Sequence, residues 1–353
     1  MKLRELRLLP ASRSEKAATR AAFGKGHLKV CVVEKLAEKL EVSEAECRGF
    51  LAEASRKYKS YLIPKKSGGY RRIAQPSHEL KRYQRAFMEI YQFPVHECAM
   101  GYVRGRSIKD NATCHVSNSY LFKTDISHFF YSIKPYIFWR VLSDLSDGKV
   151  KVADDVRGDL VSLHEELNAE SEVVEQLLFW RPGKSSDKLV LSIGAPSSPV
   201  ISNFCMFVFD EYMAKISQRQ GVVYTRYVDD LTFSTNQKNI LTGYMAIVRK
   251  VLYRCFSGAM DINLEKTIFS SKAHNRQVTG VTLANDGDLS IGRNQKRYIK
   301  HLVHYFAEKK LNEEKLNYLR GYLAFVRYIE PEFIGALYKK YSPEVMKMLM
   351  LGK

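Results

Sequence analysis

The chain has 353 residues, of which 45% are apolar, and it carries 56 Lys and Arg against 38 Asp and Glu. This length predicts two or three packed units, and the formal charge of +18 favours a polyanionic partner, with nucleic acid as the first candidate. The apolar stretches are too short to span a membrane, which excludes an integral membrane protein. The six cysteines include no C-x-x-C pair and fit a reducing cytoplasm better than a disulfide scaffold.

The N-terminal part is predicted to be a basic, helical extension. Apolar residues from Leu28 to Leu40 follow helical spacing, and Ser43 followed by Glu46 is typical of a capping box that opens a second helix. Residues 1–30 carry eight basic and two acidic side chains, which favours a retained basic arm over an organelle transit peptide.

A basic hairpin is predicted between residues 61 and 75. Two short runs with strand character, 61–63 and 70–73, flank a turn built on Gly68-Gly69. The charged side chains around this turn are cations, so we expect the turn to face an anion or solvent and not a core.

Two later segments place acids at the ends of apolar strands. The strand that starts at Tyr120 ends with Asp125, and residues 222–235 form a strand, a turn with Asp229-Asp230, and a second strand. Adjacent carboxylates at the tip of an apolar hairpin repel each other unless a cation lies between them. If the two segments are neighbours in one sheet, the three carboxylates converge.

Three converging carboxylates would suit Mg²⁺ better than Zn²⁺, which prefers His or Cys ligands. Two such ions about 3.5 to 4 Å apart would activate an attacking hydroxyl and stabilise the leaving oxygen of an in-line phosphoryl transfer. A lone Y-x-D-D sequence is equally compatible with a solvated turn. Asp154-Asp155 offers a comparison, because that pair lacks a flanking apolar strand and is assigned to a solvated surface.

The remaining segments give weaker patterns. Residues 144–175 hold ten acids and three bases, so this acidic stretch is expected to point away from any phosphate backbone. Residues 189–192 predict a strand, and residues 194–199 predict a loop that enters a helix over 200–214. From Asn294 onward, amphipathic spacing predicts two or three helices.

In order and spacing, these motifs resemble the palm of reverse transcriptases over roughly residues 61–283. The resemblance is carried by Asp125 with Phe129-Phe130, by GAPSSP from Gly194, by YVDD from Tyr227, and by Asn263-Leu264-Glu265-Lys266-Thr267. Within that family the chain most resembles bacterial retron enzymes. Asn111-Ala112-Thr113-Cys114-His115 fits their N-A-x-x-H element, and Val278-Thr279-Gly280 fits their V-T-G triplet.

The resemblance implies an α+β fold with the right-hand shape of a polymerase, in which an antiparallel palm sheet carries the metal site. The expected units are an N-terminal extension at 1–60, fingers at 61–120, a palm at 121–285 with a fingers insertion at about 134–195, and a helical thumb at 286–353. No RNase H domain is expected, so host RNase H would remove the RNA.

The resemblance also assigns the catalytic centre. Asp125, Asp229 and Asp230 would hold two Mg²⁺ ions, with the backbone carbonyl of Ile126 as a further ligand. Lys266 would be either the general acid for departing pyrophosphate or a neighbour of a phosphate, and both roles remain open.

A second set of residues would contact the incoming deoxynucleoside triphosphate. Lys65, Lys66 and Arg71 would neutralise its phosphates, and Arg can clamp two oxygens where Lys acts as a point charge. Phe130 would lie beneath the sugar and exclude a ribonucleotide 2′-hydroxyl, although a Phe in an apolar run otherwise belongs to a core.

The loop before the predicted helix would also lie near the nucleotide. Gly194 and Ala195 would let template and nucleotide approach the backbone closely. Ile193 departs from the family, which usually has Gln there, and the missing amide puts nucleotide affinity or discrimination in question. His128 is interpreted as an exposed histidine and not as a metal ligand.

A third set would bind RNA or primer: Asn111, His115, Val278, Thr279, Gly280, Lys296, Arg297 and Lys300. The first two belong to the retron-specific element and would help seat the structured RNA, the alternative being a polar pair inside a helix satisfied by backbone. The next three would lie near the primer grip. The three cations would lie along the duplex, which is read largely through shape, phosphates and 2′-hydroxyls.

The implied function is retron-type reverse transcription. A structured non-coding RNA would be template and primer, and DNA would grow from the 2′-hydroxyl of a guanosine to give branched msDNA. Such systems typically serve in anti-phage defence with an effector encoded nearby. The acidic stretch is a candidate docking surface for it, an idea refuted by unchanged effector binding after its deletion. Alternatives are an abortive-infection or intron-type reverse transcriptase, or an RNA-binding scaffold whose polymerase site has lapsed.

Overall fold

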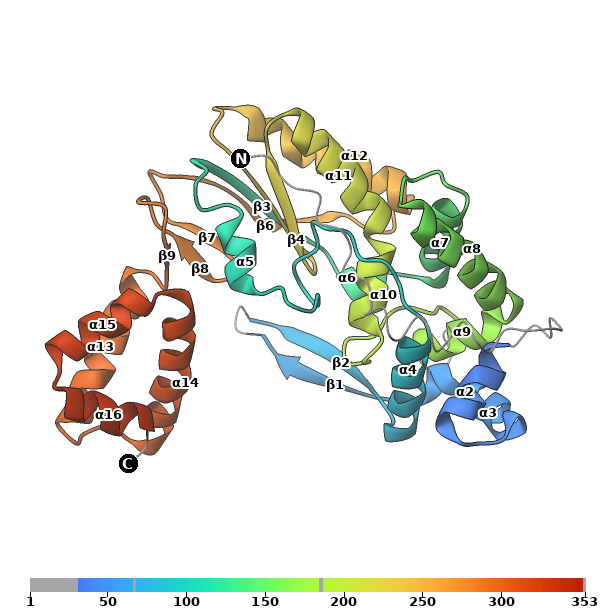
Figure 1. The fold of residues 1–353 in the computed structure, drawn as a ribbon, viewed down its shortest axis with the longest axis horizontal. Coiled ribbons are helices and arrows are strands. Elements are labelled where there is room, and N and C mark those ends of the chain that lie inside the picture. The colour runs from blue at the N-terminus through green and yellow to red at the C-terminus, as the bar shows by residue number, and fades with distance from the viewer. Residues whose placement is uncertain (1–30, 66–67, 184–186, 352–353) are drawn as a thin grey trace.

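The computed structural model describes residues 31–65, 68–183 and 187–351 (Figure 1). The basic arm predicted for residues 1–30 and the predicted phosphate contact Lys66 lie outside the described residues. None of the described helices is long and apolar enough to cross a membrane.

The described strands form three antiparallel sheets. A two-stranded sheet pairs β1 with β2, the central sheet has the order β4-β5-β3-β6, and a small sheet has the order β7-β8-β9. The strands are β1 (Tyr58–Pro64), β2 (Tyr70–Pro76), β3 (Tyr120–Ile126), β4 (Val223–Tyr227), β5 (Asp230–Thr235), β6 (Ile262–Ser271), β7 (Arg276–Val278), β8 (Val281–Leu283) and β9 (Leu289–Ser290).

Helices fill most of the rest of the described chain. Those before β4 are α2 (Val32–Leu40), α3 (Glu44–Leu51), α4 (His78–Ile90), α5 (Ile108–Thr113), α6 (Phe129–Ser132), α7 (Pro135–Ser146), α8 (Asp154–Ala169), α9 (Ser171–Leu178), α10 (Ser198–Cys205) and α11 (Phe207–Arg219). Those after β5 are α12 (Tyr244–Phe256), α13 (Arg293–Ala307), α14 (Glu313–Ile329), α15 (Pro331–Lys340) and α16 (Pro343–Leu351). Two short 3-10 helices are η1 (Ala54–Arg56) and η2 (Ile240–Gly243).

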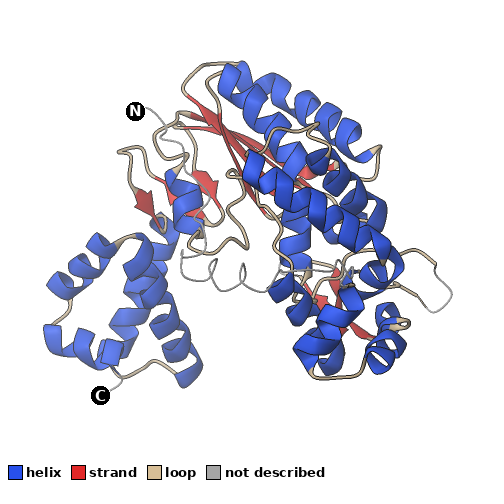
Figure 2. Ribbon diagram, turned by 45° about the vertical axis from the view of Figure 1, so that its right-hand side comes forward, coloured by secondary structure: helices blue, strands red, loops and turns tan. Residues whose placement is uncertain are grey.

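The central sheet is covered by helices on one face. Phe122 of β3 and Phe233 of β5 are paired in register and belong to the main hydrophobic core with α7 and α10 to α12. Figures 1 and 2 show α11 and α12 lying over this face. Because successive side chains of a strand alternate, Lys123 and Asp125 of β3 point to the opposite face, part of which is covered by the segment from Asn111 to His115.

The predicted helix cap at Ser43 and the predicted hairpin are both present. Ser43 Oγ accepts a hydrogen bond from the Glu46 backbone N–H at the start of α3. Strands β1 and β2 pair from Tyr58 to Pro76, so the hairpin is longer than predicted, and Gly68 and Gly69 at its turn have positive φ of 86° and 75°.

Part of the acidic stretch holds the N-terminal helices in place. Glu166 accepts a hydrogen bond from Tyr91 Oη at 2.5 Å and pairs with Lys35 of α2 at 2.6 Å. Glu170 pairs with Arg48 of α3 at 3.0 Å. These acids therefore neutralise cations of the same chain, and the exposed acids of the stretch lie elsewhere, Asp154-Asp155 at the start of α8 among them.

The strand predicted for residues 189–192 is wrong. Val190 makes one isolated bridge to Trp180, while the Leu191 N–H donates to the Ile133 carbonyl at 3.0 Å. A short apolar run can be a buried loop, and its pattern does not distinguish that loop from a strand.

The helix predicted over residues 200–214 is two helices. Helix α10 already begins at Ser198, because Pro199 is tolerated in the first turn, where an N–H has no partner within the helix. Met206 separates α10 from α11, which continues to Arg219. Both helices are apolar at the break, so periodicity gives no sign of it.

The C-terminal helices form a second hydrophobic core. The described residues after 292 form four helices, where two or three were predicted. Their core also takes in Val278 and Val281 of the small sheet, and Ala112 and Leu121 from earlier in the chain. It therefore draws on residues from both sides of the predicted boundary at 285, and the division into fingers, palm and thumb stays a prediction.

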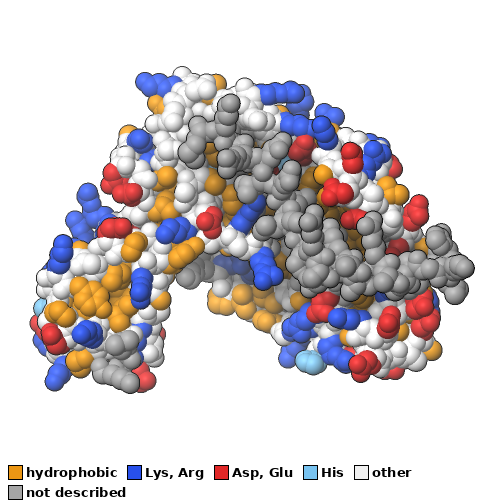
Figure 3. Space-filling view, in the orientation of Figure 1, with side chains coloured by type: hydrophobic (Ala, Val, Ile, Leu, Met, Phe, Trp, Pro, Cys, Tyr) orange, Lys and Arg blue, Asp and Glu red, His pale blue; other side chains and the backbone are white. Residues whose placement is uncertain are grey.

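The two cores leave the molecule hollowed between them. In Figure 1 the C-terminal helices stand at the lower left, apart from the β1–β2 hairpin. Figure 3 shows the surface hollowed between these parts, with several Lys and Arg side chains along the hollow. This arrangement fits the expectation of a polyanionic partner.

The aromatic stack across the central sheet tests the assigned core face. The Phe122 ring is fully buried and lies 5.6 Å from the Phe233 ring and 4.7 Å from the Phe269 ring. Phe122→Ala should lower the free energy of unfolding by about 3 to 5 kcal/mol, since it deletes buried apolar area and leaves a cavity. Phe269→Ala, at a ring that is 50% exposed, should cost clearly less in the same denaturant titration. Equal losses would contradict the assignment.

Candidate active site

The structure brings the three predicted acids together. Asp125 near the end of β3 is the direct partner of Asp230 at the start of β5. Asp229 lies in the turn before β5, and its carbonyl accepts a hydrogen bond from the Ile126 N–H at 3.0 Å. The antiparallel register thus places all three carboxylates at one end of the central sheet.

A cavity of about 680 Å³ opens beside these acids. Asp125, Ile126 and Asp229 line it from the central sheet, and Lys266 and Asn263 line it from β6. The β1–β2 hairpin forms the opposite wall of the cavity, with Leu62, Lys65, Tyr70, Arg71 and Arg72. The volume falls within the range of small-molecule sites, roughly 300 to 1,000 Å³.

The carboxylates are electrostatically strained. Burial, followed by the charges of Asp125 and Asp230, raises the pKa of Asp229 to about 6. Desolvation and then the charge of Asp125 raise the pKa of Asp230, although its side chain is the most exposed of the three. Lys266 relieves part of this repulsion, because its Nζ lies 2.7 Å from Asp125 Oδ2, a contact that raises the pKa of Lys266.

The donor set fits a divalent cation. Carboxylate oxygens are the ligands that Mg²⁺ prefers, and a cation would relieve the repulsion that raises the pKa of Asp229. Within the described residues, no group of three or more His, Cys, Asp or Glu side chains is already closed around a single point. Since Asp125 gives one oxygen to Lys266, we expect that contact to loosen when a metal binds.

Comparisons with known proteins decide the family. The family described as "Reverse transcriptase (RNA-dependent DNA polymerase)" matches residues 63–283, which contain the hairpin wall and all three acids. The retron Ec83 reverse transcriptase of Escherichia coli is 42% identical over 295 residues, which cover 83% of this chain and 89% of that protein. This chain belongs to the retron reverse transcriptases. It is therefore an RNA-directed DNA polymerase that uses an RNA template and, like its family, depends on a divalent metal.

A second relative agrees with this assignment. The retron Ec73 reverse transcriptase of Escherichia coli is 30% identical over 319 residues, which cover 84% of this chain and 92% of that protein. Among solved structures, a telomerase from Candida albicans is 12% identical with a TM-score of 0.43, over 80% of this chain and 56% of that chain. A structural similarity at that level carries no argument by itself.

Three of the predicted nucleotide contacts of this retron reverse transcriptase line the cavity. Lys65 and Arg71 line the cavity, and so does Phe130, whose neighbour Phe129 is buried in the core. His128 also lines the cavity with an exposed side chain. The hairpin wall thus carries cations, Phe130 lines the same cavity, and the nucleotide-binding roles of these residues stay a prediction.

The expectation for Gly194 and Ala195 needs correction. Ile193 lines the cavity, whereas Ala195 is buried and neither it nor Gly194 reaches the cavity wall. Gly194 has a φ of 129°, and a Cβ there would lie 3.0 Å from the Ala74 carbonyl. The close backbone approach thus occurs between Gly194 and strand β2, because the loop packs against the hairpin.

Asn111 and His115 do not present side chains to RNA. Both are fully buried, and His115 lies 2.7 Å from Thr225 Oγ1 and 2.7 Å from Ser234 Oγ. The Thr225 hydroxyl donates to Asn111 Oδ1 at 2.6 Å, and burial lowers the pKa of His115 to about 3. The partners of these two side chains are therefore side-chain hydroxyls and not backbone groups, and the role of this element in seating RNA stays a prediction.

The V-T-G triplet forms the turn between β7 and β8. Val278 is fully buried in the C-terminal core, so its side chain cannot contact a primer. Thr279 and Gly280 have positive φ of 48° and 83°, and Gly280 is exposed. Asn111 Nδ2 donates to Thr279 Oγ1 at 3.5 Å, which joins the two retron-specific elements in space.

The three predicted duplex contacts on α13 differ in their exposure to solvent and in their pairing with acids. Arg297 and Lys300 are exposed, and Lys300 lies 5.6 Å from the centre of the Phe333 ring. Lys296 is half-buried and pairs with Glu330. Arg297 and Lys300 are therefore better placed than Lys296 to meet a phosphate backbone.

Tyr102 and Asn263 are among the cavity-wall residues that the sequence interpretation missed. Tyr102 lines the cavity with a φ of 59°, and burial, then the charge of Asp229, raises its pKa. Asn263 is the β6 partner of Asp125. Asn263 stood within a recognised motif without an assigned role, and the Gly101-Tyr102 pair gave no signal beyond a glycine before an aromatic residue.

Divalent metal should stabilise this retron reverse transcriptase in a pH-dependent way. Without metal, the pKa of Asp229 is about 6 when folded against an ordinary 3.8, so the folded state binds that proton more tightly. The resulting stability is fully present below the ordinary pKa and is lost as pH rises through about 6. Because Mg²⁺ competes with the proton, it should raise Tm more at about pH 7.5 than at about pH 5.5.

Thermal unfolding at both pH values, with and without Mg²⁺, measures this difference. Asp229→Asn serves as the control, since the amide cannot titrate and should largely remove the pH dependence of the Mg²⁺ effect. A wild-type Tm shift that is the same at both pH values would contradict the assignment.

Proposed function

We propose that this enzyme extends DNA on RNA with two Mg²⁺ ions held by Asp125, Asp229 and Asp230, with the Ile126 carbonyl as a further ligand. The observation that carries the proposal is the register that sets Asp125 opposite Asp230, beside a cavity walled by cations. When bound, the ions supply Lewis-acid chemistry, which activates the attacking hydroxyl and stabilises the leaving oxygen. A lapsed site would have no physical reason to keep repelling carboxylates in register.

The hairpin wall binds the triphosphate of the incoming deoxynucleotide. Lys65, Arg71 and Arg72 line the cavity opposite the carboxylates, so a nucleotide between the two walls places its phosphates against cations. Lys66 joins this set on sequence grounds. Lys266 lies on the carboxylate side, where its ammonium can give a proton to departing pyrophosphate or neighbour a phosphate.

Phe130 selects the sugar. Its ring lines the cavity close to Asp125 in sequence and is only partly buried, so it can contact a ligand. A 2′-hydroxyl meeting this ring would lose its water without gaining a hydrogen bond. Ile193 adds a second apolar surface where the family usually has an amide.

The product we propose is branched msDNA. Membership of the retron reverse transcriptases supports a cognate structured RNA as template and primer, with growth from a guanosine 2′-hydroxyl. The exposed cations Arg297 and Lys300 of α13 support contact with the duplex. On the same family grounds, host RNase H removes template RNA, and the msDNA acts in anti-phage defence with an effector protein encoded nearby.

Primer extension by the purified chain tests the polymerase proposal. Asp229→Asn should lower Mg²⁺-dependent extension of a DNA primer on RNA by at least about a hundredfold, because a metal ligand and its charge are lost. Asp155→Asn is the matched control: it makes the same change in a pair exposed on α8 and should keep wild-type activity. A wild type as inactive as Asp229→Asn would sink the proposal and favour the scaffold alternative.

The nucleic acid that copurifies with the enzyme tests the priming proposal. We expect an RNA-DNA molecule joined by a 2′,5′ linkage, which a debranching enzyme converts into separate RNA and DNA. The measurement is sequencing before and after debranching, with material from the Asp229→Asn variant as the control. Linear DNA joined through a 3′,5′ linkage would show that the enzyme primes differently.

A further inference from the structure

The turn that carries Asp229 depends on an unusual backbone conformation. Val228, the residue before Asp229, has a φ of 61° and is buried. A β-branched residue rarely adopts this left-handed conformation, because its side chain crowds the backbone. If the turn relaxed, the carboxylate of Asp229 would leave its position beside Asp125. The surrounding structure must therefore hold Val228 in place.

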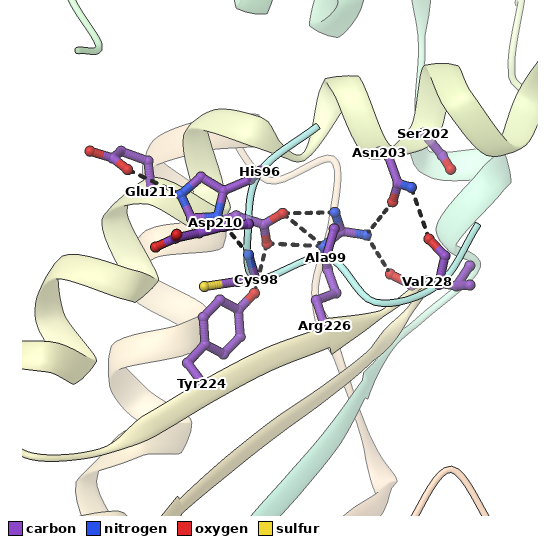
Figure 4. A network of polar contacts seen from close by, with 12 residues as sticks. His96, Cys98, Ala99, Ser202, Asn203, Asp210, Glu211, Tyr224, Arg226 and Val228 are labelled. Carbon is purple, nitrogen blue, oxygen red and sulfur yellow. Dashed lines mark hydrogen bonds and ion pairs between the residues drawn. The ribbon is translucent and has the colours of Figure 1, made fainter. Parts of the chain in front are cut away.

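A buried arginine beneath the turn supplies the first restraint (Figure 4). Arg226 is fully buried, and its Nη1 donates to the Val228 carbonyl at 3.0 Å and to Asn203 Oδ1 at 3.0 Å. Its Nε and Nη2 donate to the carboxylate of Asp210, at 2.9 Å and 2.7 Å, and that carboxylate also accepts from Tyr224 Oη. The ion pair fixes the guanidinium, and the guanidinium fixes the carbonyl of the turn.

A glycine on the other side supplies the second restraint. Asn203 Nδ2 donates to the Gly101 carbonyl at 2.9 Å, so the same amide holds Arg226 and the segment around Gly101. A Cβ on Gly101 would lie 2.7 Å from Val228 Cγ2 and 2.9 Å from the Val228 nitrogen. Val228 is thus enclosed between the arginine below and the glycine beside it.

The restraint lies on the face of the sheet away from the substrate. Arg226 pairs with Leu231 in register and shares the helix-covered face with it, and its partners Asn203 and Asp210 come from α10 and α11. The cavity is on the opposite face, and its wall does not include Arg226, Asn203 or Asp210. None of the three can therefore touch the nucleotide directly.

We propose that Arg226, Asn203 and Asp210 are positioning residues that hold Val228 in its left-handed conformation and thereby aim Asp229 at the metal site. The inference rests on the proposed metal-binding role of Asp229. Its rival is that the cluster contributes only to stability, as buried ion pairs and amides often do. The two readings differ in one respect: positioning predicts a changed metal requirement in a folded enzyme.

Asn203→Ala is the primary test, because it removes a neutral amide and leaves the Arg226–Asp210 ion pair intact. Primer extension is measured across Mg²⁺ and deoxynucleotide concentrations, with folding checked by circular dichroism and thermal unfolding. We expect the Mg²⁺ concentration for half-maximal rate to rise, or kcat to fall, by about 10- to 100-fold, as when outer partners of metal ligands are removed. The KM for the deoxynucleotide should change by less than about threefold, because no nucleotide contact is lost.

Asn118→Ala is the matched control. Asn118 is also a buried amide, and it bonds to Ser234 and Asn236, far in the sheet from the Val228 turn. It should lose stability but keep the wild-type Mg²⁺ requirement. A Mg²⁺ requirement raised equally in Asn118→Ala and Asn203→Ala would show a general effect of destabilisation and overturn the proposal.

A second substitution tests the turn itself. Asn adopts left-handed backbone more readily than Val, so Val228→Asn should restore part of the activity lost in Asn203→Ala, judged against Val228→Asn alone. Gly101→Ala reaches the turn without removing any side chain of the buried cluster and should raise the Mg²⁺ requirement in the same direction. If Asn203→Ala does not fold, Gly101→Ala with the Val228→Asn rescue decides the question.

The outcomes separate the two proposals. A wild type without Mg²⁺-dependent extension refutes the proposed function. An active wild type with a folded Asn203→Ala or Gly101→Ala variant that keeps the wild-type Mg²⁺ requirement and kcat refutes the positioning role. A raised requirement that Val228→Asn relieves supports it.

Discussion

Repulsion between three carboxylates must be balanced by the structure around them, on both faces of the central sheet. Asp125, Asp229 and Asp230 meet at one end of a sheet, where the surrounding protein screens them poorly and the pKa of Asp229 rises to about 6. Folding alone gains nothing from this arrangement. A cation between the acids would remove this repulsion. The folded site should therefore bind a divalent metal, which the proposed polymerase reaction uses.

Opposite faces of the central sheet meet this constraint in different ways. On the cavity face, Lys266 pairs with Asp125, and the cations of the hairpin line the opposite wall, where we propose that the phosphates of a nucleotide bind. On the helix-covered face, the guanidinium of Arg226, whose three nitrogens all donate hydrogen bonds, lies directly beneath the acidic turn. One face therefore handles charge that changes during the reaction, while the other provides fixed geometry, which is the division that preorganised sites require.

The sequence predicted the elements that repeat a simple pattern, and it failed where tertiary contacts decide. The convergence of the three acids followed from apolar strands that each end in Asp. The burial of Asn111 and His115 did not, because α5 has six residues and shows no complete apolar face. Gly194 was assigned to the nucleotide because of the family resemblance, and its contact with Ala74 was not foreseen because it joins segments distant in sequence. Arg226 was missed because an arginine usually occupies a solvent-facing position. The strand alternation gave the opposite signal, since Arg226 points to the other face from its neighbours Thr225 and Tyr227, the face that packs on the core.

Substitution of Mn²⁺ for Mg²⁺, followed by electron paramagnetic resonance, tests whether the three carboxylates hold a pair of metal ions. With primer, RNA template and a non-hydrolysable deoxynucleotide bound, we expect two Mn²⁺ per chain whose spectra show coupling between ions about 3.5 to 4 Å apart. Asp229→Asn should abolish the coupled signal. A spectrum of isolated ions in the wild type, or a coupled signal that survives in Asp229→Asn, would contradict the claim that these three carboxylates gather to hold the metal pair.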